Sequence, residues 1–316
     1  MLPDEKPIII FDTDMDTDCD DVGALAMLLN AHLSNKIELS GIITDSVCEY
    51  AAPFCETMLR FYKVDLPIGA IYESDYKDSD LNISRFDNYR KHSKRFINAN
   101  GYNHILSKSI QKTDRDYPSA VSTYRSLLTK AKDKSITVLC VGLLTAVAET
   151  LMSPPDSISP LSGVQLFKQK VSRVIAMGAP NEPNCFNWGM DAYASERFFA
   201  LCPTPVYISA EGTKIVTGEH LTTRLSDTHP LRRAYEIWLE KENLGRASWD
   251  LIAALYAIDP NHPYLKESNL GACNYIIDKK CLYTDKTENT QFKQISTNCE
   301  ARIMVEALNE YMVGNF

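Results

Sequence analysis

The sequence lacks the regular cysteine spacing that marks zinc sites and disulfide frameworks. Its nine cysteines are an odd number, and no two of them form a Cys-x-x-Cys pair. Both facts disfavour a zinc site and a disulfide framework. Several cysteines, such as Cys140 in ITVLCV, have the surroundings of small core residues. A reducing compartment is therefore expected.

The sequence also has no long apolar run and little positive charge. No run approaches the length needed to cross a bilayer. The strand-like run from Pro7 leaves no room for the apolar stretch and cleavage site of a signal peptide. The net charge of −8 disfavours a nucleic-acid or anionic-membrane surface, because both need clustered Lys and Arg. We expect a cytoplasmic protein with no nucleic-acid or membrane partner. The net charge does not argue against a small-molecule ligand.

No internal repeat, low-complexity segment or clear linker divides the chain, so we expect one domain over residues 1–316. Two regions depart from its general pattern. Residues 72–115 are polar and aromatic and are expected to form an excursion over one sheet edge. From about residue 215 the pattern becomes mostly helical.

Short apolar runs alternate with longer segments of helical period, which predicts an α/β fold with an open, mostly parallel sheet and flanking helices. Amphipathic helices are expected at 20–33 and 51–64. The expected strands are 7–11, 37–44, 66–71, 135–141, 171–177 and 204–209.

Six aspartates lie within the ten positions 12–21, directly after the apolar run IIIF. Two carboxylates 4 Å apart near a protein surface repel by about 4 kcal/mol. Capping of the following helix by Asp20 or Asp21 explains two of the six. The run lies between a buried strand and a helix, where open α/β sheets bind ligands. A cluster of hard carboxylate oxygens there suits Ca²⁺ or Mg²⁺ better than Zn²⁺.

Two known motifs fit this run poorly. An EF-hand needs a glycine at the sixth loop position and a glutamate at the last. A loop from Asp12 has Thr17 and Gly23 there. A haloacid-dehalogenase-type phosphatase opens with Asp-x-Asp-x-Thr/Val after a strand. Here Thr17 comes one place late and the later motifs are not evident, so this reading is kept only as an alternative.

FDTDMDTDCDDVGALAMLL resembles the opening of the inosine–uridine nucleoside hydrolase family, in the variant Asp-Thr-Asp-x-Gly-x-Asp-x-Asp-Asp. LCVGLLTAVAETL at 139–151 is similar to the family's Gly-Pro-Leu-Thr-Asn segment. MGAPNEPNCFNWGMDAYASERF at 177–198 resembles its Met-Gly-Gly and Glu-Phe-Asn stretches. VTGEHL at 216–221 and GRASWDLIAALYAI at 245–258 resemble two later segments. The order and spacing agree over nearly the whole chain.

The resemblance implies a nucleoside-hydrolase-like (Rossmann-like) fold and a calcium-dependent N-ribohydrolase. Such an enzyme cleaves the N-glycosidic bond of nucleosides or related ribosides. It further implies a homo-oligomer, either a dimer or a tetramer. Carried over by position, Asp14 would be both general base and metal ligand. The residues implied to bind Ca²⁺ are Asp14, Asp21, Asp250 and the carbonyl of Val141, and those implied to bind substrate are Asp20, Asn181, Asn187 and Trp249.

Four departures from the family pattern bear on activity. Asp16 replaces the glycine of the opening motif, where a tight backbone turn is expected. Cys185 replaces a glutamate that binds the sugar, and Ala146 replaces an asparagine. Trp249 stands where some members carry a histidine that protonates the leaving base. A catalytically impaired ribose- or nucleoside-binding relative is therefore the second hypothesis.

Overall fold

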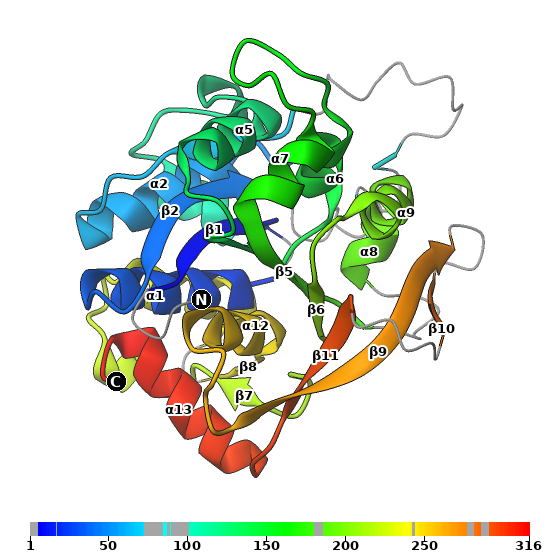
Figure 1. Ribbon diagram of the computed structural model, residues 1–316. Coiled ribbons are helices and arrows are strands. Elements are labelled where there is room, and N and C mark those ends of the chain that lie inside the picture. The colour runs from blue at the N-terminus through cyan, green and yellow to red at the C-terminus, as the bar shows by residue number, and fades with distance from the viewer. Residues whose placement is uncertain are drawn as a thin grey trace.

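The computed structural model describes residues 6–16, 18–72, 85, 86, 89, 101–179, 186–241, 244–276, 281–285 and 291–316. In this part of the chain, nine strands form one sheet in the order β10-β9-β11-β6-β5-β4-β1-β2-β3 (Figure 1). The sheet's strands are β1 (Ile8–Thr13), β2 (Glu38–Thr44), β3 (Ile68–Ala70), β4 (Ile136–Cys140), β5 (Val171–Met177), β6 (Val206–Ser209), β9 (Leu265–Ile276), β10 (Cys281–Asp285) and β11 (Phe292–Thr297). A separate two-stranded ribbon joins β7 (Val216–Thr217) to β8 (Arg246–Ala247).

The sheet is mostly parallel, as the alternation of apolar runs predicted. Every pair from β11 through β6, β5, β4, β1 and β2 to β3 is parallel, and only β9 pairs antiparallel, with β11 and with β10. All six expected strands are present with ends shifted by at most a few residues. The buried residues of β1 and β4 agree with strands covered on both faces.

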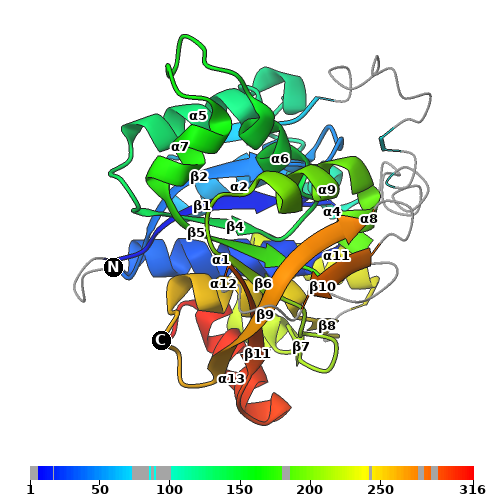
Figure 2. The same cartoon turned by 45° about the vertical axis from the view of Figure 1, so that its right-hand side comes forward.

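Helices cover both faces of the sheet (Figures 1 and 2). On one face α1 packs against α12 and α13, and on the other α5, α6, α7 and α9 pack together. The predicted helices at 20–33 and 51–64 are α1 and α2. The helices are α1 (Asp20–Leu33), α2 (Ala51–Tyr62), α4 (Tyr102–Ser107), α5 (Ala120–Lys130), α6 (Thr145–Met152), α7 (Gly163–Lys170), α8 (Phe186–Met190), α9 (Ala192–Leu201), α10 (Leu221–Arg224), α11 (Pro230–Leu239), α12 (Trp249–Ile258) and α13 (Ala301–Val313).

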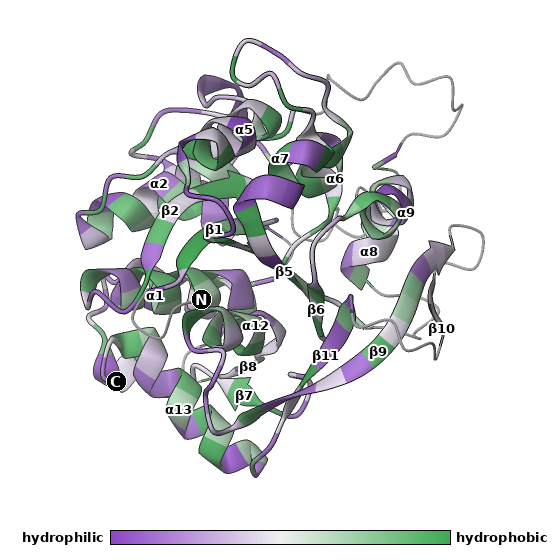
Figure 3. Ribbon diagram, viewed as in Figure 1, coloured by the Kyte–Doolittle hydropathy of each residue, from purple (hydrophilic) through white to green (hydrophobic). Residues whose placement is uncertain are grey.

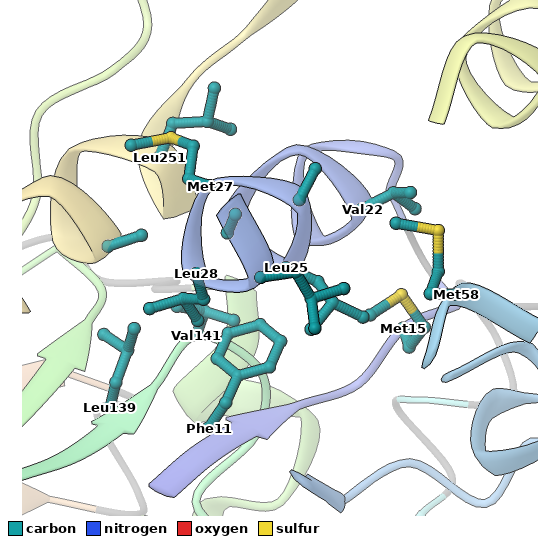
Figure 4. Packing of buried hydrophobic residues seen from close by; sticks show 14 of the residues in the cluster. Phe11, Met15, Val22, Leu25, Met27, Leu28, Met58, Leu139, Val141 and Leu251 are labelled. Carbon is teal, nitrogen blue, oxygen red and sulfur yellow. The ribbon is translucent and has the colours of Figure 1, made fainter. Parts of the chain in front are cut away.

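Alternate residues of β1 enter two separate cores. Phe11 belongs to the cluster beneath α1 and α12, whereas Ile10 belongs to the cluster beneath α5 and α6. Figure 4 shows Phe11 close to Leu25 and Leu28 of α1, with Leu251 of α12 in the same cluster. Burying one such side chain contributes about 1.5–3 kcal/mol. This packing fixes the position of α1 relative to β1, and so of the loop between them.

The expectation of a mostly helical part from about residue 215 was wrong for residues 265–276, 281–285 and 292–297. These residues form strands β9, β10 and β11, which extend the sheet. The polar sequence LKESNLGACNYI of β9 shows no continuous apolar run, because this strand lies near the sheet edge; Figure 3 shows hydrophilic and hydrophobic residues mixed along it. The expected excursion at 72–115 lies partly outside the described residues. Where it is described, it includes α4 and residues 85, 86 and 89.

Among the described residues, no helix combines the length and apolar character that a transmembrane span requires.

Candidate active site and metal centre

The aspartate run lies at the carboxyl end of β1, an interior strand of the sheet between β4 and β2. Asp12 is within β1, Asp20 and Asp21 open α1, and the loop between them carries Asp14 and Asp16. All five side chains are at most 3% exposed. A solvated acidic loop is therefore excluded, because these carboxylates have left bulk water.

Three carboxylates from two helices meet beside this loop. Asp20 and Asp21 lie in the first turn of α1, and Asp250 lies in the first turn of α12. One oxygen of each carboxylate lies within 4.8 Å of the others, and the Asp250 backbone N–H donates to Asp20 Oδ2 at 3.2 Å. We call these three residues the acidic trio.

Close packing of α1 on α12 brings the trio together, and it depends on Gly23. A Cβ atom at Gly23 would lie 2.9 Å from Leu251 Cδ1 and 2.7 Å from the Tyr235 hydroxyl. A larger residue would force the two helices apart, and with them the first turns that carry the trio. The sequence Asp-Asp-Val-Gly therefore couples two ligand-type residues to the small residue that sets their distance from Asp250.

The trio is electrostatically unfavourable by itself. Burial, followed by the charges of neighbouring aspartates, raises the pKa of Asp21 and Asp250 well above the usual range, and burial raises that of Asp20. Asp250 Oδ1 has no hydrogen-bond donor among the described residues. Neither helix uses these aspartates as its N-cap, since Cys19 and Ser248 occupy those positions. Hard, buried carboxylate oxygens, one of them without a donor in the described part of the chain, fit a divalent cation such as Ca²⁺ or Mg²⁺.

Asp14 lies next to the trio rather than within it. Its side chain contacts that of Asp21, and its charge is the largest cause after burial of the raised Asp21 pKa. The Thr13 hydroxyl donates to Asp21 Oδ1, and the Met15 N–H donates to the same oxygen at 3.4 Å. The backbone of the loop thus orients Asp21, with Asp14 at its side.

Asp16 does not occupy the strained turn position that was expected of it. The residue with positive φ is Met15, at 44°, and Asp16 is not among the described positive-φ residues. The Asp16 carboxylate accepts hydrogen bonds from the Tyr89 hydroxyl and from Asn103 Nδ2, the latter at 3.1 Å. The Asp16 carboxylate therefore binds part of the segment 72–115, because that segment supplies both hydrogen-bond donors.

Asp18 pairs with a cation from a distant part of the chain. Arg246 Nε donates to both Asp18 carboxylate oxygens at 2.9 Å. The guanidinium carbon also lies 4.6 Å from the ring centroid of Trp238 and 5.0 Å from that of Trp249. Sequence reasoning gave Asp18 no role, because a partner 228 positions away leaves no local signal.

A second acidic contact, between Asp12 and Asp45, was missed by sequence reasoning. Asp45 directly follows β2, and both of its carboxylate oxygens lack donors among the described residues. The Tyr124 hydroxyl donates to Asp12 Oδ2. Burial raises the pKa of Asp12 to about 7, against hydrogen bonds from Tyr124 and Asp45 that lower it. The available signal was an acid at the carboxyl end of the neighbouring strand, the same position that drew attention to Asp12.

The other implied site residues fall into three groups. Asn187, on α8, donates through Nδ2 to the Val141 carbonyl at 2.6 Å, which brings those two together. Trp249, the residue before Asp250, donates through Nε1 to Thr213 Oγ1 at 3.1 Å and is only partly buried. Asn181 and the departure at Cys185 lie outside the described residues.

Comparisons with known proteins identify the family and the fold of the chain. A family model described as inosine-uridine preferring nucleoside hydrolase matches residues 9–314. A comparison with curated proteins finds no match.

Solved structures share the fold at low sequence identity. A plant nucleoside hydrolase is 18% identical with a TM-score of 0.68, and the alignment covers 98% of this chain and 99% of that one. A purine-preferring ribonucleoside hydrolase from Gardnerella vaginalis is 16% identical with a TM-score of 0.66 and 98% coverage of both chains. The type III effector protein XopQ, complexed with adenosine diphosphate ribose, is 12% identical with a TM-score of 0.65, covering 99% of this chain and 94% of that one.

The family match spans almost the whole chain, and the fold is that of nucleoside hydrolase structures. The phosphatase alternative is therefore not retained. The chain belongs to the inosine-uridine preferring nucleoside hydrolase family, whose members are hydrolases acting on N-glycosyl compounds.

Proposed function

We propose that this protein is a calcium-dependent N-ribohydrolase that cleaves the N-glycosidic bond of nucleosides or related ribosides. The observation that carries the proposal is the buried acidic trio of Asp20, Asp21 and Asp250 at the carboxyl end of the sheet. Three buried carboxylates with oxygens within 4.8 Å of one another are stabilised by a compensating cation, and their oxygen donors favour Ca²⁺ over Zn²⁺.

The cation would be held by Asp21 and Asp250, with Asp14 and the Val141 carbonyl as further ligands. The carbonyl oxygen has two lone pairs, so it can accept from Asn187 and still face a cation. The trio geometry supports Asp20 at the same place, where we assign it to a ribose hydroxyl. When bound, the cation would orient a water molecule and the ribose diol and lower the pKa of that water.

The chain's own residues supply the remaining chemistry. Asp14 would accept the proton of the attacking water, because its carboxylate lies beside Asp21 in a site that excludes bulk water. Bond cleavage builds positive charge on the sugar, and the surrounding carboxylates stabilise that charge. Asn187 would orient the sugar, with Asn181 as a further contact, and Trp249 would border the leaving base.

Sugar release from a nucleoside panel tests the proposal. We expect reducing sugar to appear with purified protein and Ca²⁺, to stop after chelation, and to return when Ca²⁺ is restored. Asp14→Ala should abolish release, whereas the exposed Asp227→Ala should not change it. Failure of the wild type to release sugar from any nucleoside, or equal release by Asp14→Ala, would sink the proposal.

The second candidate is a protein that binds a ribosyl ligand without turning it over. XopQ, which has the same fold, forms a complex with adenosine diphosphate ribose, and this supports the alternative. Calorimetry distinguishes the two candidates: binding of a riboside without sugar release favours the binding protein, and efficient turnover excludes it.

The proposal also includes a small-molecule nucleoside as partner, a cytoplasmic location, a single domain over residues 1–316 and a homo-oligomer, either dimer or tetramer. Light scattering measures the oligomer. A single cooperative unfolding transition is the expected behaviour of one domain.

A further inference from the structure

The ion pair between Asp18 and Arg246 joins the two chain segments that supply the acidic trio. Asp18 lies two residues before Asp20, and Arg246 lies four residues before Asp250. Arg246 is in β8, which leads directly into α12, and Asp18 is in the loop that leads into α1. The pair therefore spans the junction where α1 and α12 present their first turns to each other.

Arg246 is held on several sides. Its guanidinium lies against the rings of Trp238 and Trp249, and its Nε contacts both Asp18 oxygens. On the same segment Ser248 Oγ lies 2.8 Å from Thr217 Oγ1, which ties β8 to β7. A planar guanidinium can stack on aromatic rings and engage a carboxylate at two atoms, which an ammonium cannot do. The geometry thus uses properties specific to arginine.

We propose that the Asp18–Arg246 pair is a positioning device that holds Asp20 and Asp21 against Asp250. This inference rests on the proposed function. The three trio carboxylates repel one another in the metal-free protein, so a tie between their segments, added to the packing of α1 on α12, opposes that repulsion. The pair supplies that tie from outside the trio, because Arg246 bonds Asp18 and leaves the trio oxygens available for a cation. Asp18 and Arg246 act through the trio and do not themselves contact substrate.

Calcium binding by the metal-free protein tests the tie directly. We expect Arg246→Met and Asp18→Asn to weaken Ca²⁺ binding by about 10- to 100-fold, the usual effect of removing groups that orient metal ligands. Arg246→Lys keeps the charge but loses the planar contact, so its loss should be intermediate. The charge-reversed double variant, Asp18→Arg with Arg246→Asp, should recover part of the loss. Arg224→Met, which removes an exposed ion pair with Glu310, is the matched control.

Kinetics separate positioning from a general loss of stability. At saturating Ca²⁺ the variants should approach the wild-type kcat, whereas at limiting Ca²⁺ they should lose activity. A variant with a lowered melting temperature and an unchanged Ca²⁺ affinity would overturn the inference. Unchanged Ca²⁺ affinity in both Arg246→Lys and Arg246→Met would overturn it too, while sugar release by the wild type would leave the proposed function intact. A wild type that binds no Ca²⁺ would remove both.

Discussion

The aspartates of one short run meet two different environments. Asp16 accepts hydrogen bonds from a tyrosine hydroxyl and an asparagine amide, and Asp12 accepts one from Tyr124. In the trio, the donors among the described residues are the Thr13 hydroxyl and the backbone N–H groups of Met15 and Asp250. Asp16 thus has side-chain donors that fix it within the fold, whereas the trio includes an oxygen without a donor in that part of the chain, Asp250 Oδ1, which is available for a cation.

The Asp12–Asp45 contact is intermediate between these environments. Asp12 has a phenol partner at one oxygen, but its other oxygen and both Asp45 oxygens lack donors among the described residues. A proton on one of the two carboxyls would supply the missing donor, and burial raises the pKa of both. The comparison therefore concerns what compensates each carboxylate: a hydroxyl or amide, a proton, or a metal ion.

Removing one trio carboxylate should have the largest effect on the difference between the two environments, because it should remove most of the stabilisation by Ca²⁺. Wild-type protein should gain about 2.7 kcal/mol in free energy of unfolding at a Ca²⁺ concentration near 100 times its Kd. Asp250→Asn should lose most of that gain. In chelator it should be at least as stable as wild type, because a buried charge has been removed.

Urea unfolding with chelator and with Ca²⁺ measures both effects. Asp227→Asn, at an exposed position, is the control and should follow wild type in both conditions. An Asp250→Asn variant that is destabilised in chelator yet keeps the full Ca²⁺ gain would show that the trio is a structural cluster.

Restoring the motif glycine at position 16 should act on stability rather than on metal binding. Asp16→Gly leaves the Tyr89 hydroxyl and the Asn103 amide without their acceptor, at roughly 1–3 kcal/mol for each buried donor. The gain on adding Ca²⁺ should stay at the wild-type value. The measurement is urea unfolding, with Tyr89→Phe in the Asp16→Gly background expected to recover part of the loss. A large change in Ca²⁺ affinity would place Asp16 with the trio instead.

The part of the fold that depends on continuous apolar runs was predictable from the sequence. The six strands β1 to β6 and helices α1 and α2 carry their pattern locally, since each is buried by the same layered packing. The strand β9 was not, because an antiparallel strand near the sheet edge needs no apolar run. The pairing of β9 depends on contacts with β11 and β10, and the sequence of β9 alone does not indicate these contacts.

The candidate site divides in the same way. Asp20, Asp21 and Asp250 could be proposed from a motif and its resemblance, and the structure brings them together. The partners of Asp16 and Asp18 could not, because Tyr89 and Arg246 reach the loop only through the tertiary fold. Sequence reasoning therefore identified the acids that we assign to a cation more readily than acids whose partners are other side chains.

Gly142 lies between the loop that carries Asp14 and the Asp12–Asp45 contact. A methyl group at this position should disturb both. A Cβ atom would lie 2.4 Å from the Asp14 backbone nitrogen and 2.6 Å from Asp45 Oδ1. Because the first of these is backbone, the loop must shift, and such overpacking costs about 1–3 kcal/mol. We expect Gly142→Ala to lower the free energy of unfolding and weaken Ca²⁺ binding together. Gly189→Ala is the control, since its Cβ would meet nothing closer than 4.0 Å. Loss of stability with unchanged Ca²⁺ affinity would separate Asp14 from the metal centre.

The smallest expected effect comes from His229. Replacing it separates the contribution of this histidine to the pH dependence of stability from that of the aspartates. His229 caps α11, accepts from the Leu231 N–H at 3.2 Å, and packs on Phe61 with ring centroids 4.4 Å apart. Burial lowers its pKa to about 4 from a usual 6.5. The unfolded chain therefore binds a proton between these values that the folded chain does not, so His229 makes the free energy of unfolding fall as pH falls through that window.

Aspartates with raised pKa act in the opposite direction, because the folded metal-free protein binds their protons more readily than the unfolded chain does. His229→Asn keeps an N-cap acceptor and should cost about 1 kcal/mol at pH 8. Below pH 6.5, in chelator, it should lose less stability than wild type or gain some. The measurement is urea unfolding from pH 8 to pH 5. A variant whose pH profile stays parallel to that of wild type would mean that His229 titrates normally, and the acid response would then come from other groups.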